Sequence, residues 1–413
     1  LMTHPFRSRR LMSCLFRLLY SCIMLSVASI PPTVVYAKLN PSTTRSALIT
    51  TPAKTDFSPS FWKLSAIPKA LRPRLSTCRG IPLSVIWAHS FKRAVDKGTS
   101  GALSMLVALA GGVGASRLLY GLAKLVPPEK LTIIVNTGDD IEMHGLHISP
   151  DVDTVIYMLA GLIEERRGWG IKGDTFHCLE MLGRYGCKTW FRLGDRDLAT
   201  HIYRTMLLRR GTPLSVATEK IRKMLGVEPK IIPMTDDKVE TWIITDVGEM
   251  HFQEYYVKRR FRDRVLGVVY RGIKNANPAP GVLEALRGAK AVVLCPSNPI
   301  VSIGPILALK GVRKTLVECE AEKIAVSPFV GSKPVRGPAD RLMEGLGVEP
   351  SAYGVAKLYA DFLDKFVLDV RDEALRDRIE ALGIEVIIAD TLMKTPADRV
   401  RLAKVVLKSI TRF

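Results

Sequence analysis

Apolar runs and helix-period segments alternate along most of the chain after residue 104. Short apolar runs bounded by glycine, proline or polar clusters predict buried strands, whereas apolar positions three and four residues apart predict helices. The expected strands are Met105–Ala110, Leu131–Val135, Ile231–Met234, Ala291–Cys295, Lys323–Pro328 and Glu385–Asp390. Strands that alternate with helices predict an α/β fold, with a doubly wound, mostly parallel, Rossmann-like sheet.

The expected helices follow these strands. Leu118 and Leu122 continue a helical pattern behind the first strand, and Pro150 opens another helix because proline is favoured in a first turn. An inserted helical and hairpin region is expected in the middle of the chain, where Val239–Asp246 pairs with Glu249–Val257. The remaining expected helices are Leu198–Leu208, Gly281–Arg287, Tyr353–Phe366, Arg371–Leu382 and Pro396–Ser409.

A glycine-rich turn separates the first strand from the first helix. Gly111, Gly112 and Gly114 stand where the apolar run ends and the helical pattern begins. Without side chains, such a turn lets backbone N–H groups and the positive end of the helix approach a phosphate group. The turn therefore predicts a phosphorylated ligand.

Acidic and amide side chains follow the second strand and begin the next helix. Asn136, Asp139 and Asp140 stand at the carboxyl end of the strand, and Asp151 and Asp153 stand in the helix's first turn. Each of the last two could simply complement the helix dipole. Next to a phosphate-binding turn, however, four aspartates so close together predict that the site holds Mg²⁺ along with the phosphate.

Two later loops also carry polar side chains suited to a ligand. Arg192, Asp195 and Arg196 lie before a predicted helix and are candidate substrate-binding residues. Arg192 and Arg196 offer forked donors to a diphosphate or an anionic ring, and Asp195 resembles a turn and cap, although an ordinary capped helix with surface arginines explains all three as well. Ser297 and Asn298 follow a buried strand and are expected to face the same crevice, since the carboxyl ends of parallel strands share one edge.

The charge of the chain is unevenly distributed. Of a formal net charge of +20, residues 1–104 carry +13, so the body gives little support for nucleic-acid binding. Residues 1–104 are expected to be a disordered leader or a non-native upstream extension, with residues 105–413 as the working domain. The alternative is a targeting segment, because arginines precede the apolar stretch Leu18–Ile30, which is short for a membrane span. Seven dispersed cysteines favour reduced thiols in a cytoplasmic protein. No membrane association is expected of the main body.

Taken together, the polar strings resemble the successive motifs of the 2-phospho-L-lactate transferase family. The resemblance extends from Met105 to about Ile410, in order and without large gaps. The matching strings are Gly111-Gly112-Val113-Gly114, Asn136-Thr137-Gly138-Asp139-Asp140, Ser149-Pro150-Asp151-Val152-Asp153-Thr154, Leu193-Gly194-Asp195-Arg196-Asp197, Pro296-Ser297-Asn298-Pro299 and Gly337-Pro338-Ala339-Asp340-Arg341-Leu342-Met343.

The resemblance implies a reaction and its substrates. A phospholactyl or phosphoenolpyruvyl group would pass from a guanosine diphosphate-linked donor to the ribityl hydroxyl of the deazaflavin Fo (7,8-didemethyl-8-hydroxy-5-deazariboflavin), releasing GMP in a step toward coenzyme F420. Magnesium assists this reaction in the family, and a homodimer is expected. The family pattern implies that Asp139 and Asp153 are the metal-binding and catalytic residues, and that Asp153 and Arg192 lie on the deazaflavin side. The glycines, Ser297 and Asn298 would then bind the nucleotide.

Other functions remain open from the sequence. Gluconeogenesis-factor proteins share the glycine turn and the aspartate region, and they would bind a nucleotide-sugar as regulators without catalysis. A Rossmann dehydrogenase is a weaker alternative, because its fingerprint needs a third glycine by position 116 or 117, and the turn continues with Ala115 and Ser116 instead. The donor acid, whether lactate, enolpyruvate or glycerate, is not determined by these motifs, since pocket shape decides such small differences.

Overall fold

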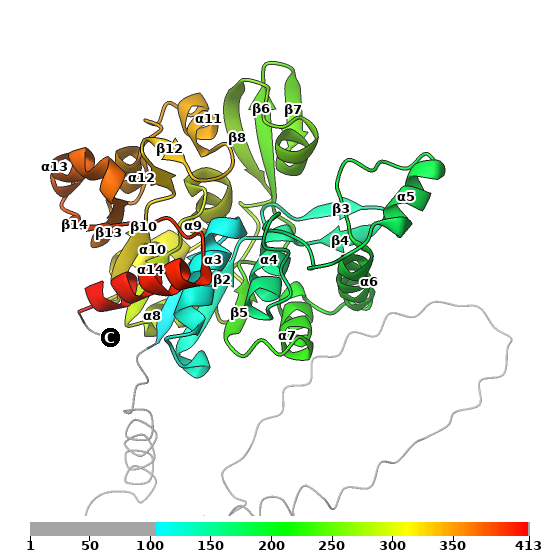
Figure 1. The fold of residues 1–413 in the computed structure, drawn as a ribbon, viewed down its shortest axis with the longest axis horizontal. Helices are drawn as coiled ribbons and strands as arrows, with labels where there is room; N and C mark the ends of the chain where they lie inside the picture. Colours follow the sequence, from blue (N-terminus) through cyan, green and yellow to red (C-terminus); the bar gives the residue numbers. More distant parts are fainter. Residues whose placement is uncertain (1–104, 412–413) are drawn as a thin grey trace, which may run out of the picture. The chain divides into compact units, whose positions relative to one another are not determined.

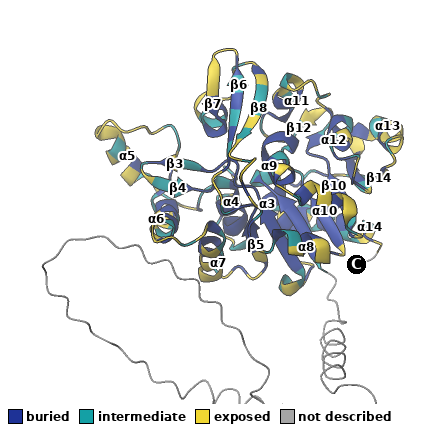
Figure 2. Ribbon diagram, turned by 180° about the vertical axis from the view of Figure 1, so that it is seen from behind, coloured by how far each residue is buried: buried dark blue, intermediate teal, exposed yellow. Residues whose placement is uncertain are grey.

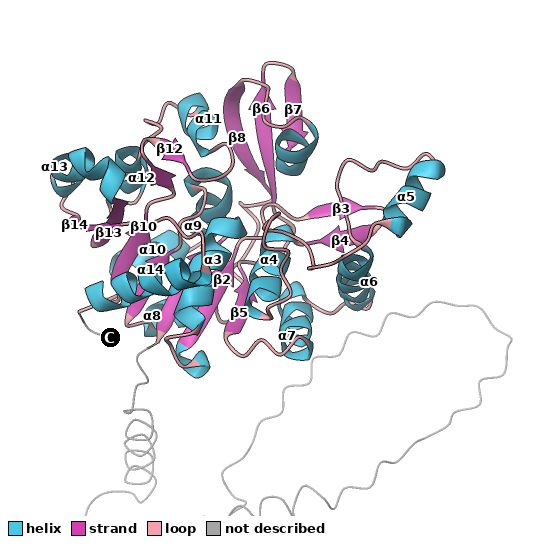
Figure 3. Ribbon diagram, viewed as in Figure 1, coloured by secondary structure: helices cyan, strands magenta, loops and turns pink. Residues whose placement is uncertain are grey.

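The computed structural model describes residues 105–411, and the predicted leader lies outside them. A seven-stranded parallel sheet forms the centre of the fold, in the order β14-β13-β10-β9-β1-β2-β5 (Figures 1 and 3). Its strands are β1 (Leu106–Ala110), β2 (Leu131–Val135), β5 (Lys230–Pro233), β9 (Ala291–Leu294), β10 (Glu322–Val326), β13 (Lys365–Asp369) and β14 (Glu385–Ala389). The predicted doubly wound α/β fold is confirmed.

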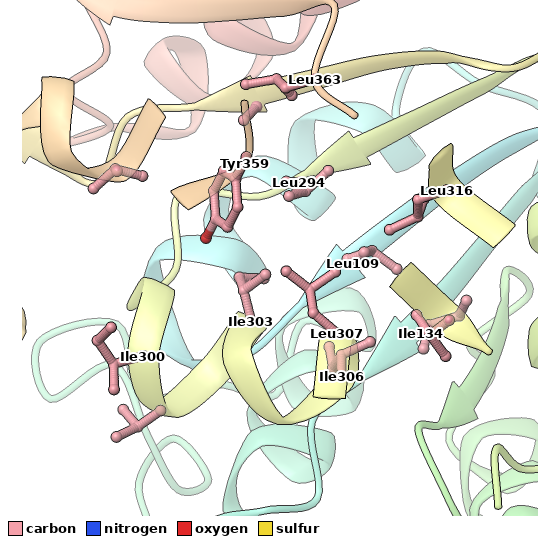
Figure 4. Packing of buried hydrophobic residues seen from close by; sticks show 14 of the residues in the cluster. Leu109, Ile134, Leu294, Ile300, Ile303, Ile306, Leu307, Leu316, Tyr359 and Leu363 are labelled. Atoms are coloured by element: carbon pink, nitrogen blue, oxygen red, sulfur yellow. The ribbon is translucent and has the colours of Figure 1, made fainter. Parts of the chain in front are cut away.

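The two faces of the sheet bury alternate residues of each strand against different helices. Val107 and Leu109 of β1 pack into one core, and Leu106 and Ala108 pack into the other. Successive side chains of a strand point to opposite faces of the sheet. Because helices cover both faces, every residue of β1 is buried, which explains its uninterrupted apolar sequence. Figure 2 shows the central strands buried throughout, and Figure 4 shows the first core around Leu109.

Two groups of helices cover the two faces. On the side of Leu109 pack α8 (Val282–Gly288), α9 (Gly304–Ala308), α10 (Val312–Glu318), α11 (Ala339–Gly345), α12 (Ala352–Leu358) and α13 (Arg376–Glu380). On the side of Leu106 pack α3 (Gly112–Ala123), α4 (Pro150–Leu159), α7 (Leu214–Met224) and α14 (Pro396–Ser409). Shorter helical segments are η3 (Pro128–Lys130), η4 (Glu254–Lys258), η5 (Pro299–Ile303) and η6 (Val370–Leu375).

The inserted region joins β2 to β9 and contains elements that project from the central sheet (Figure 1). A hairpin of β3 (Ile141–Met143) and β4 (Leu146–Ile148) precedes α4, and α5 (His177–Arg184) and α6 (Asp195–Arg209) follow it. After β5 comes an antiparallel sheet of β6 (Glu240–Thr245), β7 (Gly248–His251) and β8 (Val265–Arg271). A small pair, β11 (Phe329–Val330) and β12 (Lys333–Pro334), lies later in the chain.

Two predictions about individual elements were wrong, and one strand was not predicted. The second hairpin strand ends at His251, and residues Glu254–Lys258 are helical, because Tyr255 turns into the core as the chain leaves the sheet. The strand that was not predicted is β8 (Val265–Arg271), whose pattern is weak because all of its residues except Val265 are partly or fully exposed. The predicted helix Tyr353–Phe366 is instead α12 followed by β13.

Candidate active site

The site lies where the order of the strands reverses. After β1 the chain builds β2 and β5 on one side, and β9 and the later strands are added on the other side. At such a point the loops after two neighbouring strands, here β1 and β9, diverge and leave a crevice at their carboxyl ends. A cavity of about 470 Å³ opens there. Of the predicted site residues, it is lined by Gly111, Gly112, Gly114, Asp139, Asp151, Asp153, Arg192, Ser297 and Asn298.

The glycine turn is held closely against the loop that follows β9. A Cβ atom on Gly111 would lie 2.6 Å from the Cβ of Ser302, and one on Gly114 would overlap with the carbonyl oxygen of Pro296. The N–H group of Gly111 donates to the Oγ of Ser297 at 3.3 Å. Gly112 begins α3 with a φ of +72°, a conformation that L-residues rarely adopt. The glycines therefore allow a close approach of the two loops.

The amino end of α3 lies at this crevice, and the N–H group of Gly112 donates there to the carboxyl of Asp151. No acidic residue lies in the first turn of the twelve-residue helix, and its N-cap residue, a glycine, supplies no side-chain cap. Asn298 caps the facing helical segment η5, because its Oδ1 accepts from the N–H groups of Ile300 and Val301 at 2.9 and 3.3 Å. The geometry fits an anion such as a phosphate between the two loops.

Asp139 and Asp151 form a buried acidic pair in the cavity wall. Burial raises the pKa of Asp139 well above its usual value, and the charge of Asp151 raises it further. Burial also raises the pKa of Asp151, to about 7, although a hydrogen bond from Asn136 opposes the shift. Asp139 Oδ1 has no hydrogen-bond partner among the described residues. Burial and mutual repulsion thus oppose ionisation of the two carboxyls together, and a bound cation would favour it.

Asp153 has a different environment from this pair. Its carboxylate accepts from both terminal nitrogens of the buried Arg204, one of them at 3.0 Å. A guanidinium group already neutralises this carboxylate, so the predicted roles of Asp153 in binding Mg²⁺ and accepting a proton gain no support from its contacts.

Asn136 and Asp140 lie behind the cavity wall and support it. Asn136 donates from Nδ2 to Asp151 at 2.9 Å and accepts from the N–H group of Gly138 at 2.8 Å. Asp140 accepts from Ser149 at 2.6 Å and lies 2.9 Å from a ring nitrogen of His147. These bonds fix the loop after β2 against the start of α4.

The three predicted residues around the start of α6 are separated by the fold. Arg192 lines the cavity, with its guanidinium 4.2 Å from the ring centroid of Phe176. Asp195 instead accepts from the N–H groups of His177 and Cys178, each at 3.0 Å, at the start of α5. Arg196 is exposed outside the cavity lining. The contacts of Asp195 and Arg196 fit the capped-helix alternative.

Sequence reasoning did not identify the aromatic residues of the cavity or the buried polar residues beside Asp153. The rings of Phe252 and Tyr256 stack at 5.6 Å between centroids, and Trp169, Trp190 and Phe191 line the same cavity. Of the buried polar group, Tyr157, Asp197 and His201 line it as well. The only available signal was the helical spacing of Asp197, His201 and Arg204, which places them on one face of α6.

Arginines lie at the part of the cavity near β10 and β14. Arg117 and Arg336 line it beside Ser327 and Thr391. Burial lowers the pKa of Arg117, and the charges of Arg399 and Arg336 lower it further. The cavity thus has acidic groups from β2 and α4 and cationic groups on the opposite side of the glycine turn.

Asp139 and Asp151 are the residues best suited to hold Mg²⁺. No group of three or more ligating His, Cys, Asp or Glu side chains occurs within residues 105–411, so a dedicated protein cage is absent from that part of the chain. Mg²⁺ commonly uses one or two carboxylates, with water and substrate phosphates completing its shell. The unpartnered oxygen of Asp139 and the raised pKa values of both groups fit such a donor pair.

Comparison with known proteins agrees with the fold and the motifs. A protein from Bacillus halodurans of the UPF0052 family shares the fold, with a TM-score of 0.50 at 15% identity over 74% of this chain and 98% of that one.

Among residues 105–411, none of the helices combines the length and the hydrophobicity that a membrane span requires.

Curated relatives are much closer in sequence. The 2-phospho-L-lactate transferases of Methanosarcina mazei and Methanothermobacter thermautotrophicus are 43% and 44% identical, each over 74% of this chain and over 100% and 98% of their own lengths. The phosphoenolpyruvate transferase of Streptomyces griseus is 45% identical over 71% of this chain and 94% of its own. The family model of 2-phospho-L-lactate transferase CofD matches residues 106–406, and the chain, a transferase, belongs to this family.

Proposed function

We propose that this chain transfers a phospholactyl or phosphoenolpyruvyl group from a guanosine diphosphate-linked donor to the ribityl hydroxyl of Fo, releasing GMP. One observation carries the proposal: a single cavity joins a glycine turn suited to phosphate, a buried acidic pair and an aromatic wall with Arg192. Phosphoryl transfer depends on positioning and charge neutralisation more than on a covalent intermediate. The residues in the cavity can provide both.

The reaction would be a direct in-line displacement. The oxygen of the acceptor hydroxyl forms a bond to the phosphorus that carries the acid, and the bond from that phosphorus to the GMP oxygen breaks, so GMP leaves with the electron pair. The next N–H groups of α3 after that of Gly112, those of Val113 and Gly114, together with the hydroxyl of Ser297, hold the diphosphate. Because Asp139 and Asp151 are the proposed ligands of Mg²⁺, the proton of the hydroxyl passes to an oxygen of the leaving phosphate or to water.

Asp139 and Asp151 would hold Mg²⁺, and this assignment replaces Asp153 with Asp151 in the set expected from the sequence. Bound there, the ion would neutralise phosphate charge as the GMP oxygen departs. The aromatic wall that includes Trp190 and Phe252 offers flat faces to the deazaflavin ring, and Arg192 offers donors to its polar edge.

The names of the relatives leave the donor acid open. Proteins named for phospholactate and for phosphoenolpyruvate match this chain at 43% and 45% identity. The test is therefore incubation of the full chain with Fo, Mg²⁺ and each guanosine diphosphate-linked acid in turn, with products identified by mass. Guanosine diphosphate without an acid is the matched control.

The outcomes separate the candidate functions. A product with the mass of acid-phosphate plus Fo, together with GMP, supports the transferase. Tight binding of a uridine diphosphate-sugar with no transfer from any donor would support the nucleotide-sugar-binding regulator instead. Replacing both carboxylates, by Asp139→Asn and Asp151→Asn, should abolish transfer, and full activity of that double variant would contradict the roles given to the pair.

We also propose that the protein acts in the cytoplasm as a homodimer. Cys178 and Cys187 are free and exposed thiols, which suit a reducing compartment, and two-fold dimers are the commonest assembly of such enzymes. Sedimentation of the purified full chain would test the dimer, and a monomer at micromolar concentration would contradict it.

A further inference from the structure

A row of buried polar side chains connects α4 with α6 beside the cavity. Tyr157 donates from its hydroxyl to Asp197 Oδ1 at 2.8 Å, and His201 Nε2 lies 3.2 Å from the same oxygen. Arg204 Nη1 lies 3.4 Å from His201 Nδ1, and both Nη1 and Nη2 of Arg204 donate to Asp153. All five side chains are buried, and all except Arg204 line the cavity.

The donor properties of Arg204 determine the role of each group in the row. A guanidinium has no acceptor, so His201 Nδ1 accepts from Arg204 and the ring proton resides on Nε2. Nε2 then faces Asp197 at ion-pair distance, although its direction falls short of a good hydrogen bond. His201 also lies 3.6 Å from Asp153 through Nδ1, so the ring packs along the carboxylate that Arg204 holds.

This arrangement fixes the orientation of Asp153. A carboxylate has about four acceptor positions, and the forked guanidinium occupies one on each oxygen. Two positions remain for a ligand, and Asp153 reaches the cavity although only 4% of it is exposed. The charge of Arg204 disfavours a second cation at the same carboxylate, whereas a hydroxyl group can still donate to it.

We infer that Arg204 and His201 are positioning residues that orient Asp153 as a hydrogen-bond acceptor for hydroxyl groups of the acceptor's polyol chain. This inference rests on the proposed function and extends it. The resemblance already places Asp153 on the deazaflavin side, and the contacts add Arg204 and His201 as the residues that orient it. Tyr157 and Asp197 complete the row and hold His201 from its other side.

The test compares two arginines with similar contacts. Arg204→Lys keeps the positive charge but loses the two-point contact with Asp153. Its control is Arg399→Lys, because Arg399 is 1% exposed and donates from two nitrogens to Glu165, outside the cavity lining. Steady-state kinetics of the full chain give separate KM values for Fo and for the donor, and melting curves report stability for both variants.

The expected result is a rise in the KM for Fo of about 10- to 100-fold in Arg204→Lys, as for an Asp153 displaced by about 1 Å, with the donor KM unchanged. Arg399→Lys should lower the melting temperature while both KM values stay at wild-type levels. His201→Phe keeps a ring in place but removes the acceptor for Arg204, so its KM for Fo should also rise. If Arg204→Lys does not fold, His201→Phe decides the question.

Two results would overturn the inference. A wild-type KM for Fo in the folded variants would show that the row serves stability alone. Equal rises in both KM values would show a general disturbance of the cavity. If the wild-type chain transfers nothing to Fo, the proposed function fails and the inference fails with it, so the wild-type assay distinguishes the two failures.

Discussion

Replacing Gly111 with alanine tests whether the close approach of the two loops builds the phosphate site. The backbone of Gly111 is extended, with φ −160° and ψ 137°, so alanine causes no strain in the dihedral angles. The added Cβ would lie 2.6 Å from the Cβ of Ser302 and 2.7 Å from Asp151 Oδ2. Carbon atoms prefer about 3.5–4.0 Å, so the loop after β9 must move by about 1 Å.

This displacement gives two measurable magnitudes. Overpacking of this kind costs about 1–3 kcal/mol, which should appear as a lower free energy of unfolding in urea titrations. A shift of about 1 Å in groups that position the donor can reduce kcat/KM by up to about 100-fold. Because Fo is expected on the opposite wall, its affinity should change much less than that of guanosine diphosphate.

Gly288→Ala is the matched control for this change. Gly288 ends α8, and its Cβ would meet only the Cε of Met105, at an ordinary 3.7 Å. This variant should therefore retain stability and activity. A Gly111→Ala protein with a wild-type free energy of unfolding and a wild-type kcat/KM would refute this reasoning, because the two loops would then accommodate the added methyl group without displacement.

Three further predictions concern the carboxylates. Asp153→Asn should lower the free energy of unfolding by about 3–5 kcal/mol in urea titrations, because it leaves the buried Arg204 unpaired; wild-type stability would contradict the ion pair. Burial raises the pKa of Asp151 in the folded protein to about 7, so the ionised group costs stability as pH rises from about 4 to 7, toward roughly 4 kcal/mol. Mg²⁺ binds only the ionised carboxylate and offsets this cost, so added Mg²⁺ should raise the melting temperature more at pH 8 than at pH 5. An equal rise at both pH values, or the same rise in an Asp139→Asn variant, would exclude the pair as the metal site. Asp195→Ala should lower the melting temperature, because it removes the acceptor of the first N–H groups of α5, while kcat/KM stays within about twofold of wild type. A large loss of activity would show that Asp195 takes part in the active site.

Most of the sheet could be predicted because its strands are buried on both faces. Such strands appear in the sequence as unbroken apolar runs, as in Leu131–Val135, whose bounds are those of β2. β13 was missed because Lys365–Asp369 follows α12 without a glycine or proline to separate helix from strand. Strands with partly exposed faces, such as β8, carry a weaker pattern.

The candidate site could be predicted where it depends on strand ends, and only in part elsewhere. Glycines and acids that follow strands reach one crevice because parallel strands end at one edge. The partners of each acid depend on helices far along the chain, so the sequence could not separate Asp153, paired with Arg204, from Asp151, which has no cationic partner among the described ion pairs. The same limit applies to Asp195, whose bonds reach back to α5.

The hydrogen bond between Gly111 and Ser297 joins residues that are 186 positions apart. Contacts of such long sequence separation form late in folding, because a long loop must close first. At about 5–20 residues per second, a ribosome needs roughly 10–40 seconds to add the second loop after the first. During synthesis, β1 therefore has an unpaired edge until β9 has been made, and the phosphate site forms only after β9 pairs with β1. Donor binding by a newly made chain would thus serve as a readout of completed folding.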